Sequence, residues 1–240
     1  MQIELTQYKS DNNLKHNLFR SPHIVNHCLI EIPFNYRNTC WFCGEPKDKN
    51  INFPKKAYEA NIVNHEPICL PSRNECASII QRSAFTSIYA YRDAIKQGLV
   101  KKHQKILSIG SNWTEQELLE SELEGSAFEG FKRSAWPMFK MMQARINYKG
   151  WDIIINNDQL IEEKEHQPFE FDGVVYTRLE DAVSHAVKTF FLDEQLFTRV
   201  LSVLGKGKFS QAIRLCRLYP NLNSKQRESV FQEILDSIGL

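Results

Sequence analysis

The 240-residue chain has no long apolar run, few glycines and prolines, and no excess of either charge. Its 10 glycines and 9 prolines are too few for a collagen-like, low-complexity or disordered chain, so we expect a folded core. The longest apolar segments, such as 151–155, are far shorter than the ~20 residues that a membrane span requires. Residues 1–15 are polar and lack the apolar stretch of a secretory signal. We therefore expect a cytoplasmic protein with no membrane association.

The chain also lacks internal repeats, a glycine-rich phosphate loop, a Gly-x-Ser-x-Gly elbow and the kinase signature motifs. The formal net charge of +1 does not by itself predict a polyanionic partner. However, the charge is unevenly distributed, with +6 over residues 1–112, −8 over 113–200 and +3 over 201–240. This asymmetry indicates an acidic partner for the basic segments, or simply a solvated surface.

The hydrophobic pattern predicts an α+β protein that is mostly helical and built from two units, 1–147 and 148–240. The first unit is expected to hold short strands in 22–36, the cysteine motifs, and then helices. Ser72 and Glu75 have capping-box spacing at the start of a long amphipathic pattern that ends near Gly98. Further helices are expected at 99–107, after the Thr114 and Glu117 capping box, and at 131–146. The second unit is expected to pair a strand at 151–155 with one at 169–176, across an acidic loop at 162–165, before a bundle with helices at 179–191, 193–204, 210–218 and 224–238.

One motif indicates a chemical role, the Cys-x-x-Cys-Gly sequence that contains Cys40, Cys43 and Gly44. Two cysteines at this spacing can hold one metal ion from a tight turn, and glycine permits the backbone conformation that follows. In a reducing compartment, six cysteines in a chain of this length favour metal ligands or buried thiols over disulfides. The sequence predicts a structural zinc site with four cysteine ligands, Cys40, Cys43, Cys69 and Cys76.

The spacing of the second cysteine pair is irregular, because Arg73 stands where a second Cys-x-x-Cys would place a ligand. His65 is a spare ligand before Cys69. The alternative interpretation is a set of reduced, buried thiols in which Arg73 or its neighbours fill the position of a lost metal ion. Cys28 and Cys216 lie in apolar stretches and are expected in the core.

The cysteine knuckle, the segment from Leu70 to Cys76, and the positions that follow to residue 125 resemble the HNH-like treble-clef proteins of bacteria and phages. In that group, a Cys-x-x-Cys knuckle and a cysteine-bearing helix start flank a zinc ion, and helices rich in lysine and arginine follow. The resemblance implies a treble-clef zinc unit and a nucleic-acid partner.

The chain departs from that family where catalysis would require a histidine. An HNH nuclease needs a histidine on the first hairpin strand to activate water, and the corresponding segment 51–56 has none. His65 is the one rival, but it precedes Cys76 by only 11 residues, which is too close for an intervening strand of ordinary length. We therefore favour a non-enzymatic protein over a divergent metal-dependent nuclease that uses His65.

The helices of the second unit are compatible with a helix-turn-helix arrangement. In 210–218, Ile213 and Cys216 fall on one face, with Ser210, Arg214 and Arg217 opposite. The sequence therefore predicts a zinc-containing protein that contacts the phosphates of nucleic acid. The predicted contact residues are Lys55, Lys56, Arg73, Lys101, Lys102, Arg214 and Arg217. A protein-interaction adaptor, in which the acidic segment pairs with a partner, is the remaining alternative.

Overall fold

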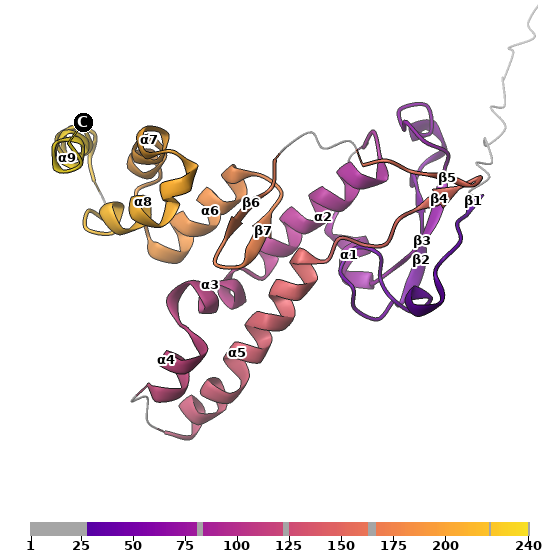
Figure 1. Cartoon of the computed structure of the whole chain (residues 1–240), viewed down its shortest axis with the longest axis horizontal. Helices are drawn as coiled ribbons and strands as arrows, with labels where there is room; N and C mark the ends of the chain where they lie inside the picture. The colour runs from indigo at the N-terminus through magenta and orange to yellow at the C-terminus, as the bar shows by residue number, and fades with distance from the viewer. Residues whose placement is uncertain (1–27, 81–83, 122–124, 163–166, 221, 240) are drawn as a thin grey trace, which may run out of the picture.

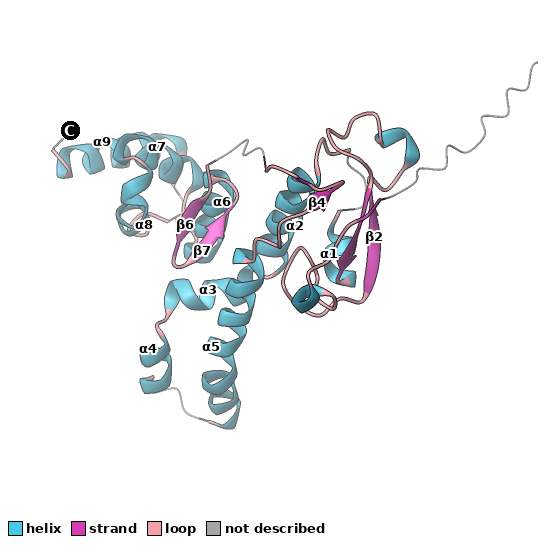
Figure 2. Cartoon of the chain, turned by 45° about the vertical axis from the view of Figure 1, so that its right-hand side comes forward, coloured by secondary structure: helices cyan, strands magenta, loops and turns pink. Residues whose placement is uncertain are grey.

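The computed structural model describes residues 28–80, 84–121, 125–162, 167–220 and 222–239. A small sheet and a short helix form one end of the molecule, two long helices cross its middle, and a helical bundle forms the other end (Figure 1). Helices predominate over strands, as Figure 2 shows, which confirms the predicted α+β class. The described α-helices are α1 (Asn74–Ile79), α2 (Ile88–Lys102), α3 (Gln104–Asn112), α4 (Glu115–Glu120), α5 (Ser126–Asn147), α6 (Leu179–Phe190), α7 (Glu194–Leu204), α8 (Phe209–Cys216) and α9 (Ser224–Ser237).

The sheet next to the cysteines has the strand order β1-β3-β2. Strand β3 lies in the centre, parallel to β1 and antiparallel to β2, with Phe53 opposite Ile68. Its strands are β1 (Cys28–Leu29), β2 (Lys49–Phe53) and β3 (Ile68–Ser72). Short 3-10 helices, η1 (Phe34–Tyr36) and η2 (Ala57–Glu59), interrupt the connections before β2 and between β2 and β3. In the strand region predicted at 22–36, residues 22–27 lie outside the described residues, and residues 28–36 contain β1 and η1.

The single long helix predicted over 72–98 is wrong. Ser72 belongs to β3, α1 ends at Ile79, and α2 begins separately at Ile88 after an N-cap in which Ser87 accepts a hydrogen bond from the backbone N–H of Ala90. Apolar residues recur at helical spacing on both sides of the break, so periodicity alone did not reveal where the backbone turns. The helix predicted at 99–107 is divided in the same region, because α2 continues to Lys102 and α3 starts at Gln104.

The predicted pairing of 151–155 with 169–176 is also wrong, since each segment forms a local hairpin. Strand β4 (Ile154–Ile155) pairs with β5 (Asp158–Gln159), and β6 (Phe169–Phe171) pairs with β7 (Val174–Tyr176). Each hairpin closes through two residues with positive φ. These are Asn156 and Asn157 between β4 and β5, and Asp172 and Gly173 between β6 and β7. Such turns match the twist of antiparallel strands and close a hairpin locally. Most of the acidic loop predicted between the strands lies outside the described residues.

The remaining helices follow the sequence pattern more closely. Thr114 and Glu117 form the predicted capping box of α4, and Asp193 caps α7 by accepting a hydrogen bond from the backbone N–H of Leu196. One apolar core runs from the sheet to the bundle and includes buried residues on both sides of residue 147. The indole Nε1 of Trp41 donates to the carbonyl of Trp151 at 2.9 Å, which ties the cysteine knuckle to the segment after α5.

Candidate metal centre

The knuckle that carries Cys40 and Cys43 is a closed turn. The backbone N–H of Gly44 donates to the carbonyl of Cys40 at 3.0 Å, and that of Cys40 donates to the carbonyl of Glu45 at 2.7 Å. Gly44 has φ +76°, and a Cβ at this position would lie 3.0 Å from the ring of Tyr148. Glycine is therefore required here both for the backbone angle and for the space.

Cys76 reaches the knuckle from the first turn of α1. The β2 and β3 hairpin connects the two, and the backbone N–H of Trp41 donates to the carbonyl of Pro71 at 3.0 Å, which places the knuckle against the end of β3. The sulfurs of Cys40, Cys43 and Cys76 all lie within 4.8 Å of one another, and all three residues are buried. Two sulfurs on one tetrahedral zinc ion are about 3.8 Å apart, given Zn–S bonds of about 2.3 Å. The cluster can therefore hold a metal ion with little movement.

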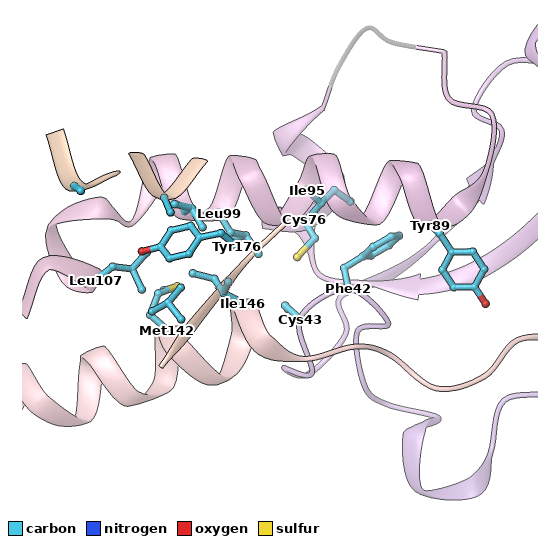
Figure 3. Packing of buried hydrophobic residues seen from close by; sticks show 14 of the residues in the cluster. Phe42, Cys43, Cys76, Tyr89, Ile95, Leu99, Leu107, Met142, Ile146 and Tyr176 are labelled. Carbon is cyan, nitrogen blue, oxygen red and sulfur yellow. The ribbon is translucent and has the colours of Figure 1, made fainter. Parts of the chain in front are cut away.

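Figure 3 shows Cys43 and Cys76 in the middle of a row of buried side chains that runs along α2. Leu107 and Tyr176 lie on one side of the cysteines, and Phe42 and Tyr89 lie on the other. The cysteines are therefore part of the core rather than of an exposed loop.

Cys69, the fourth predicted ligand, is not part of this group. It lies on β3 between Ile68 and Leu70, which are both fully buried, while Cys69 itself is only partly buried. Successive side chains of a strand point to opposite faces, so a strand that buries its neighbours in the core turns Cys69 away from it. Arg73 does not fill the metal position either, because its guanidinium donates to the Glu45 carboxylate at 3.2 Å. The described residues thus supply three thiol ligands instead of the predicted four.

The three thiols form hydrogen bonds with one another, and these shift their pKa values in different directions. Hydrogen bonds from Cys43 and Cys76 lower the pKa of the Cys40 thiol, assisted by the backbone N–H groups of Arg73 and Phe42. The contact with Cys40 in turn raises the pKa values of Cys43 and Cys76. The hydrogen bonds among the thiols therefore favour the loss of one proton from the cluster as a whole, and a bound cation would displace the others.

Two buried cations lie beside the thiols, and sequence reasoning missed both. The Lys96 ammonium donates to the carbonyls of Arg145 and Tyr148, at 2.7 and 2.6 Å. Burial lowers the pKa of Lys96 to about 7, although the nearby cysteines act in the opposite direction. The Arg145 guanidinium lies between the Cys43 thiol and the Glu75 carboxylate. The only available signal was a lysine and an arginine within the apolar stripes of α2 and α5.

Glu75, one residue before Cys76, connects three elements. Its carboxylate accepts hydrogen bonds from Lys102 and His103 at the end of α2 and from Arg145 on α5. Burial raises the pKa of Glu75, but the hydrogen bonds from Lys102, Arg145 and His103 outweigh this effect and lower it to about 2. The first turn of α1 is therefore fixed by ionic contacts as well as by its cysteine.

His65, the alternative catalytic residue, is not part of the cysteine cluster, and both of its ring nitrogens have partners within the protein. Its Nε2 accepts from the backbone N–H of Ile88 at 3.0 Å, and its Nδ1 lies 2.7 Å from the carbonyl of Glu66. Its ring stacks on Phe53 with centroids 5.6 Å apart, and burial lowers its pKa. Both ring nitrogens are engaged, so neither is available to accept a proton from water in this arrangement.

Several predicted phosphate-binding side chains have partners within the protein. Lys55 donates to the carbonyls of Ala77 and Ile80 at the end of α1, and Lys56 donates to the Tyr58 hydroxyl. Arg73 pairs with Glu45 and Lys102 with Glu75. The exposed members of the set are Lys55, Lys56, Lys101, Lys102, Arg214 and Arg217, and the last of these lies over the ring of Phe190.

Comparisons with protein-family models, curated proteins and solved structures found no match to this chain. None of the described helices combines the length and the apolar composition that a membrane span requires.

Proposed function

We propose that Cys40, Cys43 and Cys76 bind a zinc ion that joins the knuckle to the first turn of α1. The convergence of three buried sulfurs from two separate chain segments is the observation that carries this proposal. Thiolates favour soft or borderline metals, and zinc is the usual ion for knuckles of this kind. The enclosure of the sulfurs by core side chains supports a structural role, and a zinc ion held by these three thiolates keeps one position for a fourth ligand.

The groups around the sulfurs support an anionic metal–thiolate centre. Three thiolates and one Zn²⁺ carry a net charge of −1, and the Arg145 and Lys96 side chains are the nearby cations. Within the described residues, the Nε of Arg145 and the hydroxyls of Tyr91 and Tyr148 are buried without hydrogen-bond partners. Burial raises the pKa of each of these tyrosines to about 12, so both remain donors. A negatively charged centre is stabilised by such surroundings.

Metal analysis of the purified protein tests the zinc site. We expect about one zinc per chain in the wild type and its loss in Cys40→Ser. Cys69→Ser is the matched control, since it removes a thiol from the neighbouring strand β3 without touching the cluster, and it should retain the metal. A metal-free wild type, or equal loss in both variants, would reject the proposal.

We further propose that the protein binds nucleic acid without cleaving it, in keeping with its resemblance to HNH-like treble-clef proteins. The order of knuckle, hairpin and helix around the cysteines supports the resemblance, and the engaged ring of His65 supports a non-enzymatic role. Nucleic-acid affinity should fall steeply as salt increases, because phosphate contacts release counterions. Affinity that is unchanged between low and moderate salt would argue against this function.

Plasmid incubation with Mg²⁺ or Mn²⁺ tests the non-enzymatic part of the proposal. We expect no cutting by the wild type. Cutting that His65→Ala abolishes would instead assign the protein to the metal-dependent nucleases.

A further inference from the structure

The segment from residue 195 to residue 227 contains seven lysines and arginines and no aspartate or glutamate. Two of the seven are paired with carboxylates outside the segment, Arg199 with Glu228 at 2.7 Å and Arg227 with Asp193 at 2.9 Å. No ion pair is recorded for the other five in the described parts of the chain; these are Lys206, Lys208, Arg214, Arg217 and Lys225. Within the described residues, this part of the molecule therefore presents positive charge that no ion pair neutralises, although Glu180 and Glu194 line the same hollow as Lys206.

Most of these cations lie on or beside one helix, whose orientation is fixed by its apolar face. The inner face of α8 is buried through Phe209, Ala212, Ile213 and Cys216. Phe209 contacts the rings of Phe169 and Phe171 of the hairpin, with centroids 4.9 and 4.8 Å apart. Arg214 and Arg217 consequently face outward and are exposed, as their spacing from Ser210 predicted.

The turn before α8 adds two more cations. Helix η3 (Lys206–Lys208) joins α7 to α8, which pack against each other, and both lysines of η3 are exposed. The α7–turn–α8 unit places cations at both ends of a short helix. With eight residues, α8 is about 12 Å long.

We infer that this outer face of η3 and α8, the α8 face, binds the phosphate backbone of double-stranded DNA. The inference rests on the proposed nucleic-acid function and assigns it to one surface. A duplex fits better than a single strand, because single-strand binding uses aromatic side chains as stacking platforms. The exposed positions of α8 are instead Ser210 and Arg214, with Arg217 directly after the helix. Because phosphate contacts carry no base information, binding by this face alone is sequence-tolerant.

The test measures binding of the zinc-loaded full-length chain to a fluorescein-labelled random-sequence duplex by fluorescence anisotropy over a series of salt concentrations. The test variant is Arg214→Gln with Arg217→Gln. The matched control is Arg133→Gln with Lys140→Gln, which removes the same charge from exposed positions of α5. Glutamine has a helix propensity similar to that of lysine and arginine, so both variants should fold, and circular dichroism verifies this.

We expect the salt slope of log K to become shallower by about 1 for each cation removed from the α8 face, with the control equal to the wild type. If the two double variants bind alike, the inference is wrong while the nucleic-acid function stands. If the wild type binds a single strand or anionic phospholipid vesicles more tightly than the duplex, the assigned partner is wrong. If it binds no nucleic acid at all, this inference and that part of the proposed function both fail, and the zinc site is unaffected.

Discussion

Charged side chains near the cysteines and on α8 are arranged in opposite ways. Around the sulfurs, Lys96 and Arg145 are buried and contact carbonyls, a thiol and a carboxylate. On the α8 face, Arg214 and Arg217 are exposed, and the segment that carries them has no carboxylate of its own. Buried charges must be paired to be tolerated, whereas exposed cations stay hydrated until a partner arrives.

The buried cations near the cysteines therefore stabilise the fold, whereas the exposed cations of the α8 face are available for binding. Removing a cation near the cysteines should change stability, and removing one from the α8 face should change only what the protein binds.

Metal removal should have the largest effect, and it should be confined to one end of the molecule. Structural zinc contributes an apparent binding free energy of about 10–16 kcal/mol in small zinc domains. A chelator should therefore abolish amide protection in β2, β3 and α1, while α7 and α8 remain protected. Hydrogen exchange followed by mass spectrometry measures this directly, and uniform loss across the chain would contradict the local role of the ion.

Glu75→Gln should be the next most damaging change. It leaves Arg145 buried without its carboxylate, and breaking a buried ion pair costs about 3–5 kcal/mol. Glu45→Gln is the matched control, because the Glu45 and Arg73 side chains are 30% and 37% exposed and such pairs contribute about 0–1 kcal/mol. Urea denaturation of the zinc-loaded proteins compares the two, and equal losses would show that burial does not distinguish these pairs.

Asp193→Asn isolates one ion pair of the bundle. Asparagine is as good a helix N-cap as aspartate, so the change removes mainly the charge-assisted hydrogen bonds to Arg227. Their loss should lower the free energy of unfolding by about 1.5–3 kcal/mol. The hydrogen bonds from Arg227 lower the pKa of Asp193 below its ordinary value of 3.8. The stabilisation is thus fully present above pH 3.8 and is lost as the pH falls through the lower folded-state pKa.

The unfolding free energies of wild type and Asp193→Asn should therefore converge on acidification. A difference between them that stays constant down to strongly acidic pH would show that Asp193 does not act through its charge.

Arg199→Gln should have the smallest effect. Its pair with Glu228 is exposed on both sides, and such pairs contribute little to stability. The guanidinium also lies over the ring of Phe231, with 4.0 Å between Cζ and the ring centroid, so a small but measurable loss is expected. Thermal unfolding measures it, and a loss as large as that of Glu75→Gln would remove the distinction between the two ends.

Local sequence signals were reliable where a single turn decides the structure. The capping box of Thr114 and the cap of Asp193 were predicted because side-chain oxygen and backbone N–H lie within three residues of each other. The Asp172–Gly173 turn carried the same kind of signal for a local hairpin, but the predicted long-range strand pair overrode it. Strand pairing depends on which segments meet in space, so apolar alternation alone did not specify it.

In the candidate site too, local signals were predictive and long-range contacts were not. The Cys40 and Cys43 spacing identified the knuckle, and Cys76 was correctly associated with it. Cys69 was included because it is near in sequence, but strand alternation turns it away from the group. Lys96 and Arg145 carried no recognisable motif, because their importance comes from contacts between α2, α5 and the knuckle.

The order of residues alone determined the helical character, the knuckle and the polar stripe of α8, because each depends on neighbours within a turn or two along the chain. Only the tertiary structure decided that three sulfurs rather than four converge, and that two cations are buried beside them. It also separated the partnered lysines and arginines from those that face solvent. These outcomes depend on segments far apart in the sequence, such as those of Glu75 and Arg145, 70 residues apart, whose meeting is set by packing of the whole core.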